Sequence, residues 1–197
     1  YATAMGHLIY LESEPEISIQ LLKPNLGNFV LGDSSEPKDT IEVLKRCRDS
    51  QQQIFQKLKS KNPKLNIHNC DKNLDLSDLK TNEIELYNGM IQNRDILKRV
   101  LPELEKDEPN HKFIGELLSE HHTILRDVLQ VSTPKIESML DAAMDAGALG
   151  GKINGSGGGG CMFAYAPNEP EKVAEAVKKV SGYTHIIHSD AGTEILI

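Results

Sequence analysis

The sequence predicts an α+β fold in which helices cover one face of a mostly antiparallel sheet. Three short strand-like segments come first, a long block of helical patterns follows, and a strand–helix–strand pattern ends the chain. Strands and helices that are segregated along a chain in this way are typical of α+β domains. The 197 residues are 39% hydrophobic, which is enough for one large domain with a substantial core.

The first strands are expected near the start of the chain. Residues 7–11 and 17–21 alternate weakly around a turn at 13–15, and a third short strand covers 29–31. A second turn at 24–28 separates the third strand from the first two. The beginning of the chain therefore predicts a hairpin followed by one further strand.

Helical periodicity then dominates the chain. Asp39 and Glu42 have the spacing of a capping box at the start of the first helix, whose apolar stripe includes Ile41 and Leu44. Pro134 suits the first turn of the fourth helix. The predicted helices cover residues 39–59, 82–105, 111–130, 133–147 and 168–182.

Further strands are expected between and after the last helices. Residues 161–166 form an apolar run typical of a buried strand, and 183–187 form another. Residues 191–197 are expected to add one more. These segments complete the sheet.

Composition narrows the function classes. The net charge is −7 and no dense basic patch occurs, so nucleic acid is not an expected partner. No apolar run of about 18 residues and no signal-peptide pattern occurs, so we expect neither membrane insertion nor secretion. The three cysteines are widely spaced and are expected to be reduced thiols of a cytoplasmic protein.

The most informative stretch is a glycine-rich loop, in which Gly155, Gly157, Gly158, Gly159 and Gly160 enclose a single serine. A flexible linker is the usual interpretation of such a run. Here the run lies between a predicted helix and a predicted buried strand, which favours a shaped loop that receives a ligand or a neighbouring loop. A dinucleotide loop is excluded because a strand follows rather than a helix, and a P-loop is excluded because Gly-Lys-Ser/Thr is absent.

Ser156 is the one hydroxyl group inside the loop, where backbone N–H groups could surround an anion. The other polar candidates have ordinary structural interpretations. His121 lies on the apolar stripe of its helix and is expected to be a hydrogen-bonded core histidine. Arg126 and Asp127 are expected to form a solvated ion pair. A metal site at residues 68–70 is not expected, because no second pair at zinc spacing follows.

These motifs together resemble a known family. The pattern Gly150-Gly151-Lys152-x-Asn154, continued by 155–161, is similar to the third motif of the GHMP kinases, named for galacto-, homoserine, mevalonate and phosphomevalonate kinases. The preceding stretch 118–134, with its His-Thr-Ile-Leu-Arg-Asp and Val-Ser segments, resembles the equivalent region of galactokinases.

The resemblance implies a two-domain enzyme that uses ATP and Mg²⁺. It makes residues 1–28 the tail of the N-terminal kinase domain and residues 29–197 a ferredoxin-like C-terminal domain with inserted helices. The family's phosphate loop, sugar-contacting motif and catalytic aspartate belong to the missing N-terminal domain, which is an expected partner. No catalytic residue and no metal ligand is therefore expected in this chain, and the chain alone is expected to be inactive.

The expected function is the C-terminal portion of a galactokinase-like sugar kinase, in which residues 155–160 contact substrate or phosphate. Galactokinases usually place a sugar-contacting tyrosine after the strand that corresponds to 29–31, and residues 32–38 contain none. A kinase for another small alcohol or sugar phosphate, of the mevalonate or heptose phosphate type, is therefore an alternative. A non-catalytic sugar-sensing relative and a regulatory module without kinase ancestry are two more.

Overall fold

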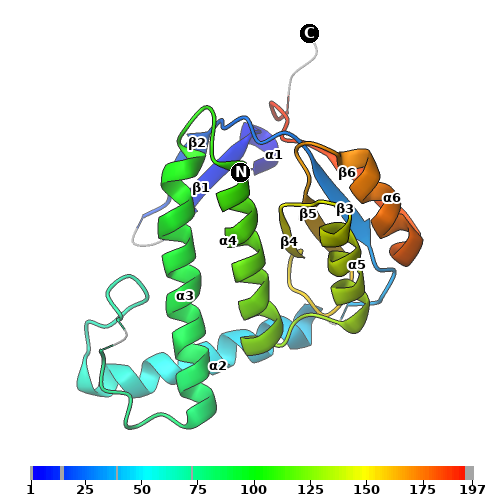
Figure 1. The fold of residues 1–197 in the computed structure, drawn as a ribbon. Helices are drawn as coiled ribbons and strands as arrows, with labels where there is room; N and C mark the ends of the chain where they lie inside the picture. Colours follow the sequence, from blue (N-terminus) through cyan, green and yellow to red (C-terminus); the bar gives the residue numbers. More distant parts are fainter. Residues whose placement is uncertain (1, 14–15, 39, 72, 194–197) are drawn as a thin grey trace.

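The structure, a computed structural model, describes residues 2–13, 16–38, 40–71 and 73–193. The strands are β1 (Leu8–Glu12), β2 (Ser18–Leu22), β3 (Phe29–Asp33), β4 (Gly150–Ile153), β5 (Cys161–Tyr165) and β6 (Tyr183–Ile187). The helices are α1 (Ala2–Met5), α2 (Thr40–Lys61), α3 (Thr81–Leu104), α4 (His111–Thr123), the π-helix η1 (Ile124–Val128), α5 (Pro134–Asp145) and α6 (Pro170–Ser181). The predicted α+β class is confirmed (Figure 1).

The main sheet has the strand order β4-β5-β3-β6, and every neighbouring pair is antiparallel. Its outer face is covered by α5 and α6, which connect its strands (Figure 1). Val30 and Ala164, which are paired across β3 and β5, are fully buried on this face together with Met162. This order and connectivity are the expected ferredoxin-like arrangement, in which the segment from α2 to η1 is the inserted helical block.

Local sequence signals explain the ends of α5. The side chain of Thr133 accepts a hydrogen bond from the backbone N–H of Ile136 at 3.3 Å, and Pro134 occupies the first turn. Gly147 follows the helix with a φ of 105°, a conformation that favours glycine. The helix therefore begins and ends close to where the sequence predicts.

β1 and β2 form a separate two-stranded antiparallel sheet at the start of the chain. The predicted hairpin is confirmed, although Glu14 and Pro15 of the predicted turn lie outside the described residues. The strand expected at 191–197 is not found over residues 191–193, which have no regular structure, and residues 194–197 lie outside the described part.

The first long helix differs from its prediction in what it buries. Its predicted apolar stripe fails at Ile41 and Leu44, whose side chains are 82% and 53% exposed. Only Ile54 and Leu58 of α2 are buried, in a small cluster with α3. Asp39, expected to begin this helix, lies outside the described residues. No helix in the described part of the chain is both long enough and apolar enough to cross a membrane.

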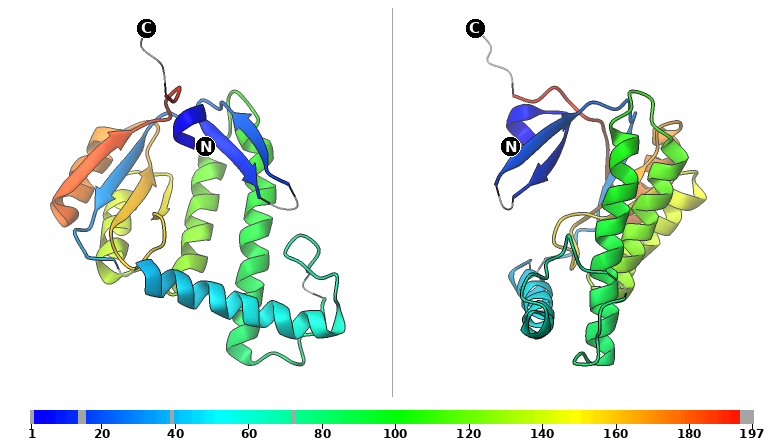
Figure 2. Two further views of the ribbon diagram at one scale, coloured as in Figure 1. Left: turned by 180° about the vertical axis from the view of Figure 1, so that it is seen from behind. Right: turned by 90° about the vertical axis from the view of Figure 1, so that its left-hand side faces the viewer.

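The molecule has a concave side opposite α5 and α6. Figure 2 shows the β1–β2 hairpin and α2 projecting on the same side of a layer that α3, α4 and the main sheet form. A cavity of about 730 Å³ lies between the hairpin, α2 and α3, with Tyr10, Phe55 and Arg94 in its lining. On the face of the main sheet opposite α5 and α6, Tyr165 is buried against Leu26 and Ile114, while Phe29 and Phe163 are half-buried.

Candidate functional site

The glycine loop between β4 and β5 is a shaped turn. Gly155, Gly157, Gly158, Gly159 and Gly160 all have positive φ, between 71° and 113°. Other residues adopt this conformation only with strain, so the glycines are required by the backbone itself. The loop is thus the ordered structure that its flanking elements predict, and a flexible linker does not describe it.

The loop is packed closely against the neighbouring chain. A Cβ at Gly157 would lie 2.5 Å from the carbonyl oxygen of Val131, and a Cβ at Gly159 would lie 3.1 Å from that of Pro37. The backbone N–H of Gly158 donates to the oxygen of Val131 at 2.7 Å, and the N–H of Gly160 donates to Glu36 at 3.3 Å. The glycines thus allow two other segments to reach the loop backbone.

Lys38 and Thr40 bring polar groups to the loop. The Lys38 ammonium donates to the carbonyl oxygen of Asn154 at 3.2 Å, and its stem lies where a Cβ at Gly160 would be. The hydroxyl group of Ser156 donates to that of Thr40 at 3.3 Å. Sequence reasoning selected Ser156 and missed these two partners, although both follow the strand β3 within a few residues.

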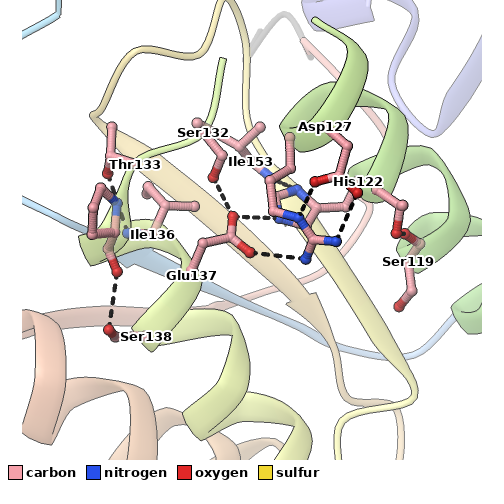
Figure 3. A network of polar contacts seen from close by, with 12 residues as sticks. Ser119, His122, Asp127, Ser132, Thr133, Ile136, Glu137, Ser138 and Ile153 are labelled. Atoms are coloured by element: carbon pink, nitrogen blue, oxygen red, sulfur yellow. Dashed lines mark hydrogen bonds and ion pairs between the residues drawn. The ribbon is translucent and has the colours of Figure 1, made fainter. Parts of the chain in front are cut away.

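A polar network ties the loop's entry strand to the helices (Figure 3). The backbone N–H of Ile153 donates to Nδ1 of His122 at 3.3 Å, and Nε2 of the same ring lies 2.9 Å from Oε1 of Glu137. Because Nδ1 accepts, Nε2 carries the proton and donates to the carboxylate. Ser132 also donates to Oε1, and Arg126 donates to Oε2 at 3.3 Å.

The electrostatics of Glu137 reflect this network. Burial raises its pKa, but the hydrogen bonds from Ser132 and His122 outweigh burial and lower the pKa overall. Glu137 is therefore an ionised hydrogen-bond acceptor that connects α5 to α4. The expected ion pair of Arg126 with Asp127 is present at 2.7 Å, and its extension to Glu137 is the part that the sequence did not predict.

The helix predicted for 111–130 is α-helical only to Thr123 and continues as the π-helix η1. Its wider turn is closed by a hydrogen bond from the N–H of Leu129 to the oxygen of Ile124 at 3.0 Å. The N–H of Val131 then donates to the oxygen of Leu125 at 3.0 Å. Since Val131 accepts from Gly158, the π-helix fixes the residue that supports the loop.

The expectation for His121 is wrong in detail. His121 is half-buried, and no residue in the described part of the chain forms a hydrogen bond with it, whereas His122 is 6% exposed and fully hydrogen-bonded. Burial, and then the nearby positive charge of Lys152, lower the pKa of His121 to about 4. The ring of His121 is therefore neutral near pH 7.

The remaining candidates do not form a site. Across the described residues, no group of three or more His, Cys, Asp or Glu side chains is arranged to hold a metal ion. Cys70 is buried and its thiol donates to the oxygen of Ile67 at 3.2 Å, while His68 is exposed. His185 and His188 are exposed.

Comparison with known proteins identifies relatives of the region that contains the loop. Residues 100–181 match the family described as GHMP kinases C terminal. Mevalonate kinase of Pyrococcus furiosus is 45% identical over 83 residues, which are 42% of this chain and 24% of that protein. Galactokinase of Bacillus subtilis is 28% identical over 106 residues, 48% of this chain and 27% of that protein. The chain thus matches about a quarter of the length of these relatives.

Two solved structures have the same fold at low sequence identity. Mevalonate kinase of L. major in complex with R-mevalonate has a TM-score of 0.67 and 16% identity, covering 93% of this chain and 50% of that one. Galactokinase of Lactococcus lactis complexed with galactose has a TM-score of 0.68 and 19% identity, covering 96% and 52%. Nearly the whole chain therefore corresponds to about half of a larger protein in each case.

Proposed function

Since residues 100–181 belong to the GHMP kinase C-terminal family, we propose that this chain is the C-terminal portion of an ATP-dependent small-molecule kinase. The observation that carries the proposal is the glycine loop, fixed by Val131 and Glu36 and bordered by the ammonium group of Lys38. Phosphoryl transfer depends on positioning and on neutralising charge, and a rigid loop that lets phosphate approach backbone N–H groups suits that task.

The acceptor is, in this proposal, a small alcohol of the mevalonate type. The supporting observation is the identity of 45% to a mevalonate kinase, against 28% to a galactokinase. The absence of a tyrosine from residues 32–38 also argues against galactose as the substrate. A galactokinase-like sugar kinase, which the motif at 118–134 favours, is the second candidate.

Residues 1–28 belong, in the same proposal, to the kinase domain that precedes this one. A two-stranded sheet is marginally stable alone, and within the described residues β1–β2 pairs with no strand of the main sheet, although Leu8 packs in one apolar cluster with Phe29 and Tyr165. The concave side between the hairpin and α2 is where a preceding domain would pack (Figure 2). The substrate cleft would then lie between the two domains, with the glycine loop on one wall.

ATP would supply the phosphoryl group, and residues 155–160 with Lys38 would contact its phosphates or the acceptor. The described residues contain no group of three or more His, Cys, Asp or Glu side chains that could hold a metal ion. Because Mg²⁺ usually binds substrate phosphates together with only one or two carboxylates, the phosphates of ATP would hold it in this proposal. No step of the reaction is assigned to a residue of this chain, which binds and orients.

A coupled ADP-release assay tests the proposal on the intact protein that includes this chain. We expect turnover with mevalonate and weak or no turnover with galactose, and we expect the 197-residue chain alone to phosphorylate neither. Turnover with galactose but not mevalonate would select the sugar-kinase candidate. If no small alcohol or sugar supports the release of ADP, the kinase proposal is wrong.

A further inference from the structure

Lys152 is the residue that the proposed function leaves unexplained. It lies in β4, two residues before the loop begins at Asn154. Its neighbour Ile153 is fully buried in the core that α5 completes, and a Cβ at Gly151 would meet Leu140 of that helix. Side chains alternate along a strand, so Lys152 points to the opposite face, toward the concave side.

The ammonium group of Lys152 has an aromatic neighbour but no anion. Its nitrogen lies 5.3 Å from the ring centroid of Phe163, its partner in the β4–β5 register. No carboxylate or carbonyl group of the described residues pairs with it, whereas Lys57 pairs with Glu83 at 2.7 Å. Burial also lowers the pKa of Lys152. Holding a half-buried cation without a counter-charge costs free energy of desolvation. This points to an anionic partner that the chain itself does not supply.

The ring of Phe163 next to this cation is also part of the wall of an apolar cavity, which Lys152 itself does not line. The cavity has a volume of about 480 Å³, within the range of small-molecule sites, and it is lined by Phe163, His121 and apolar residues of β1, α3 and α4. Asn93 also lines the cavity, and its side-chain oxygen is buried without a hydrogen-bond partner among the described residues. The cavity thus offers an apolar wall, and Phe163 connects that wall to the cation.

We propose that Lys152 binds an oxyanion of the acceptor substrate, so that the kinase acts on an alcohol that already carries a carboxylate or phosphate group. The inference rests on the proposed function and narrows its substrate class. The alkyl part of the acceptor lies against Phe163, and the anion pairs with Lys152. A neutral hexose would leave the cation unpaired.

Three variants of the intact kinase test this assignment. Lys152→Met keeps the unbranched stem and removes the charge, Lys152→Arg restores a charge, and Lys112→Met removes a charge from a side chain that is 82% exposed. With mevalonate as the acceptor, we expect Lys152→Met to raise KM at least tenfold while KM for ATP stays within about twofold. Lys152→Arg should recover part of the loss, and Lys112→Met should match the parent.

The outcomes separate this inference from the proposed function. A rise in KM for ATP instead of the acceptor would assign Lys152 to the nucleotide and overturn the inference. Equal losses of activity with mevalonate and with a neutral acceptor would also overturn the inference. So would an effect on thermal stability alone, because both results would mean that the charge of Lys152 supports the fold and does not bind the acceptor. If galactose 1-phosphate rather than mevalonate depends on Lys152, the oxyanion is a phosphate and the inference holds.

A binding measurement covers the case in which the intact protein turns over no acceptor, which would refute the proposed function. The ¹³Cε signal of Lys152 in the intact protein that includes this chain, assigned by its loss in Lys152→Arg, is followed by NMR. Mevalonate should shift this signal, and its neutral lactone, which has the same skeleton without the anion, should not. The absence of a shift with both mevalonate and galactose 1-phosphate would overturn the inference on its own.

Discussion

Replacing His122 by leucine should destabilise the chain by about 3 kcal/mol. The side chain is 6% exposed, and its loss leaves the buried N–H of Ile153 without an acceptor, which costs about 1–3 kcal/mol. It also removes a hydrogen bond to ionised Glu137, worth about 1.5–3 kcal/mol. The total is less than the sum because Ser132 and Arg126 still donate to that carboxylate.

Urea unfolding of the full chain measures this loss, and a thermal scan should show a Tm lower by about 6–12 °C. His188→Leu is the matched control, because His188 is exposed and its replacement should change stability by less than about 0.5 kcal/mol. A double-mutant cycle with Glu137→Leu should give a coupling energy above about 1 kcal/mol. Hydrogen exchange of the backbone amide of Ile153, in β4, should accelerate more than exchange of the amides in β5 and β3.

The reasoning is refuted if His122→Leu is no more destabilising than His188→Leu, or if the two sites in the cycle behave independently. Either result would mean that the contacts in Figure 3 do not hold β4 in place. The position of the glycine loop would then depend on its contacts with Val131, Glu36 and Lys38.

Two further predictions concern the loop and the cavity. Gly157→Ala should lower both stability and ATP affinity, because the added Cβ would meet the carbonyl oxygen of Val131. The control is Gly182→Ala, at a glycine that also has a positive φ but has no atom within 4 Å of an added Cβ, so it should show the cost of backbone strain only. Urea unfolding and calorimetric titration with ATP compare the two variants, and equal losses would contradict the clash with Val131. For His121, a folded pKa of about 4 against 6.5 when unfolded means that the unfolded state takes up the proton first as pH falls. The contribution of His121 to the free energy of unfolding should therefore be fully present above pH 6.5 and should decrease, by at most about 3 kcal/mol, as the pH falls to 4. His121→Leu should flatten this dependence of stability on pH and leave kcat within about tenfold of the parent. If the dependence on pH is the same in His121→Leu, the assignment is wrong.

Local signals were sufficient for much of the fold. The caps of α5 and the glycine after α6 have physical effects that act within a few residues, so their positions were predictable. The exposed stripe at Ile41 and Leu44 was not, because periodicity shows which face of a helix is apolar and not whether another element covers it. β4 was missed since four residues that begin with two glycines carry no strand pattern.

The two adjacent histidines show where helical periodicity fails. The pattern at 114–129 identified the side of α4 that faces α3 and placed His121 on it. The helix has a second buried side, because Gly115 lies against the backbone of Leu149 and Gly150 and lets α4 approach β4. His122 is seven residues, or two turns, after Gly115, so that spacing was the available signal. His122, which accepts a hydrogen bond from the strand that leads into the loop, lies on this second side.

The central position of β3 has a consequence for the order of folding. β3 pairs with both β5 and β6, yet the whole helical block separates it from them along the chain. β4 and β5 are close in sequence and can pair early, while among the described strands β6 pairs only with β3. Closing a long loop slows such pairing, because its entropy must be lost before the contacts form. During synthesis, β3 must therefore wait for partner strands that leave the ribosome well after it.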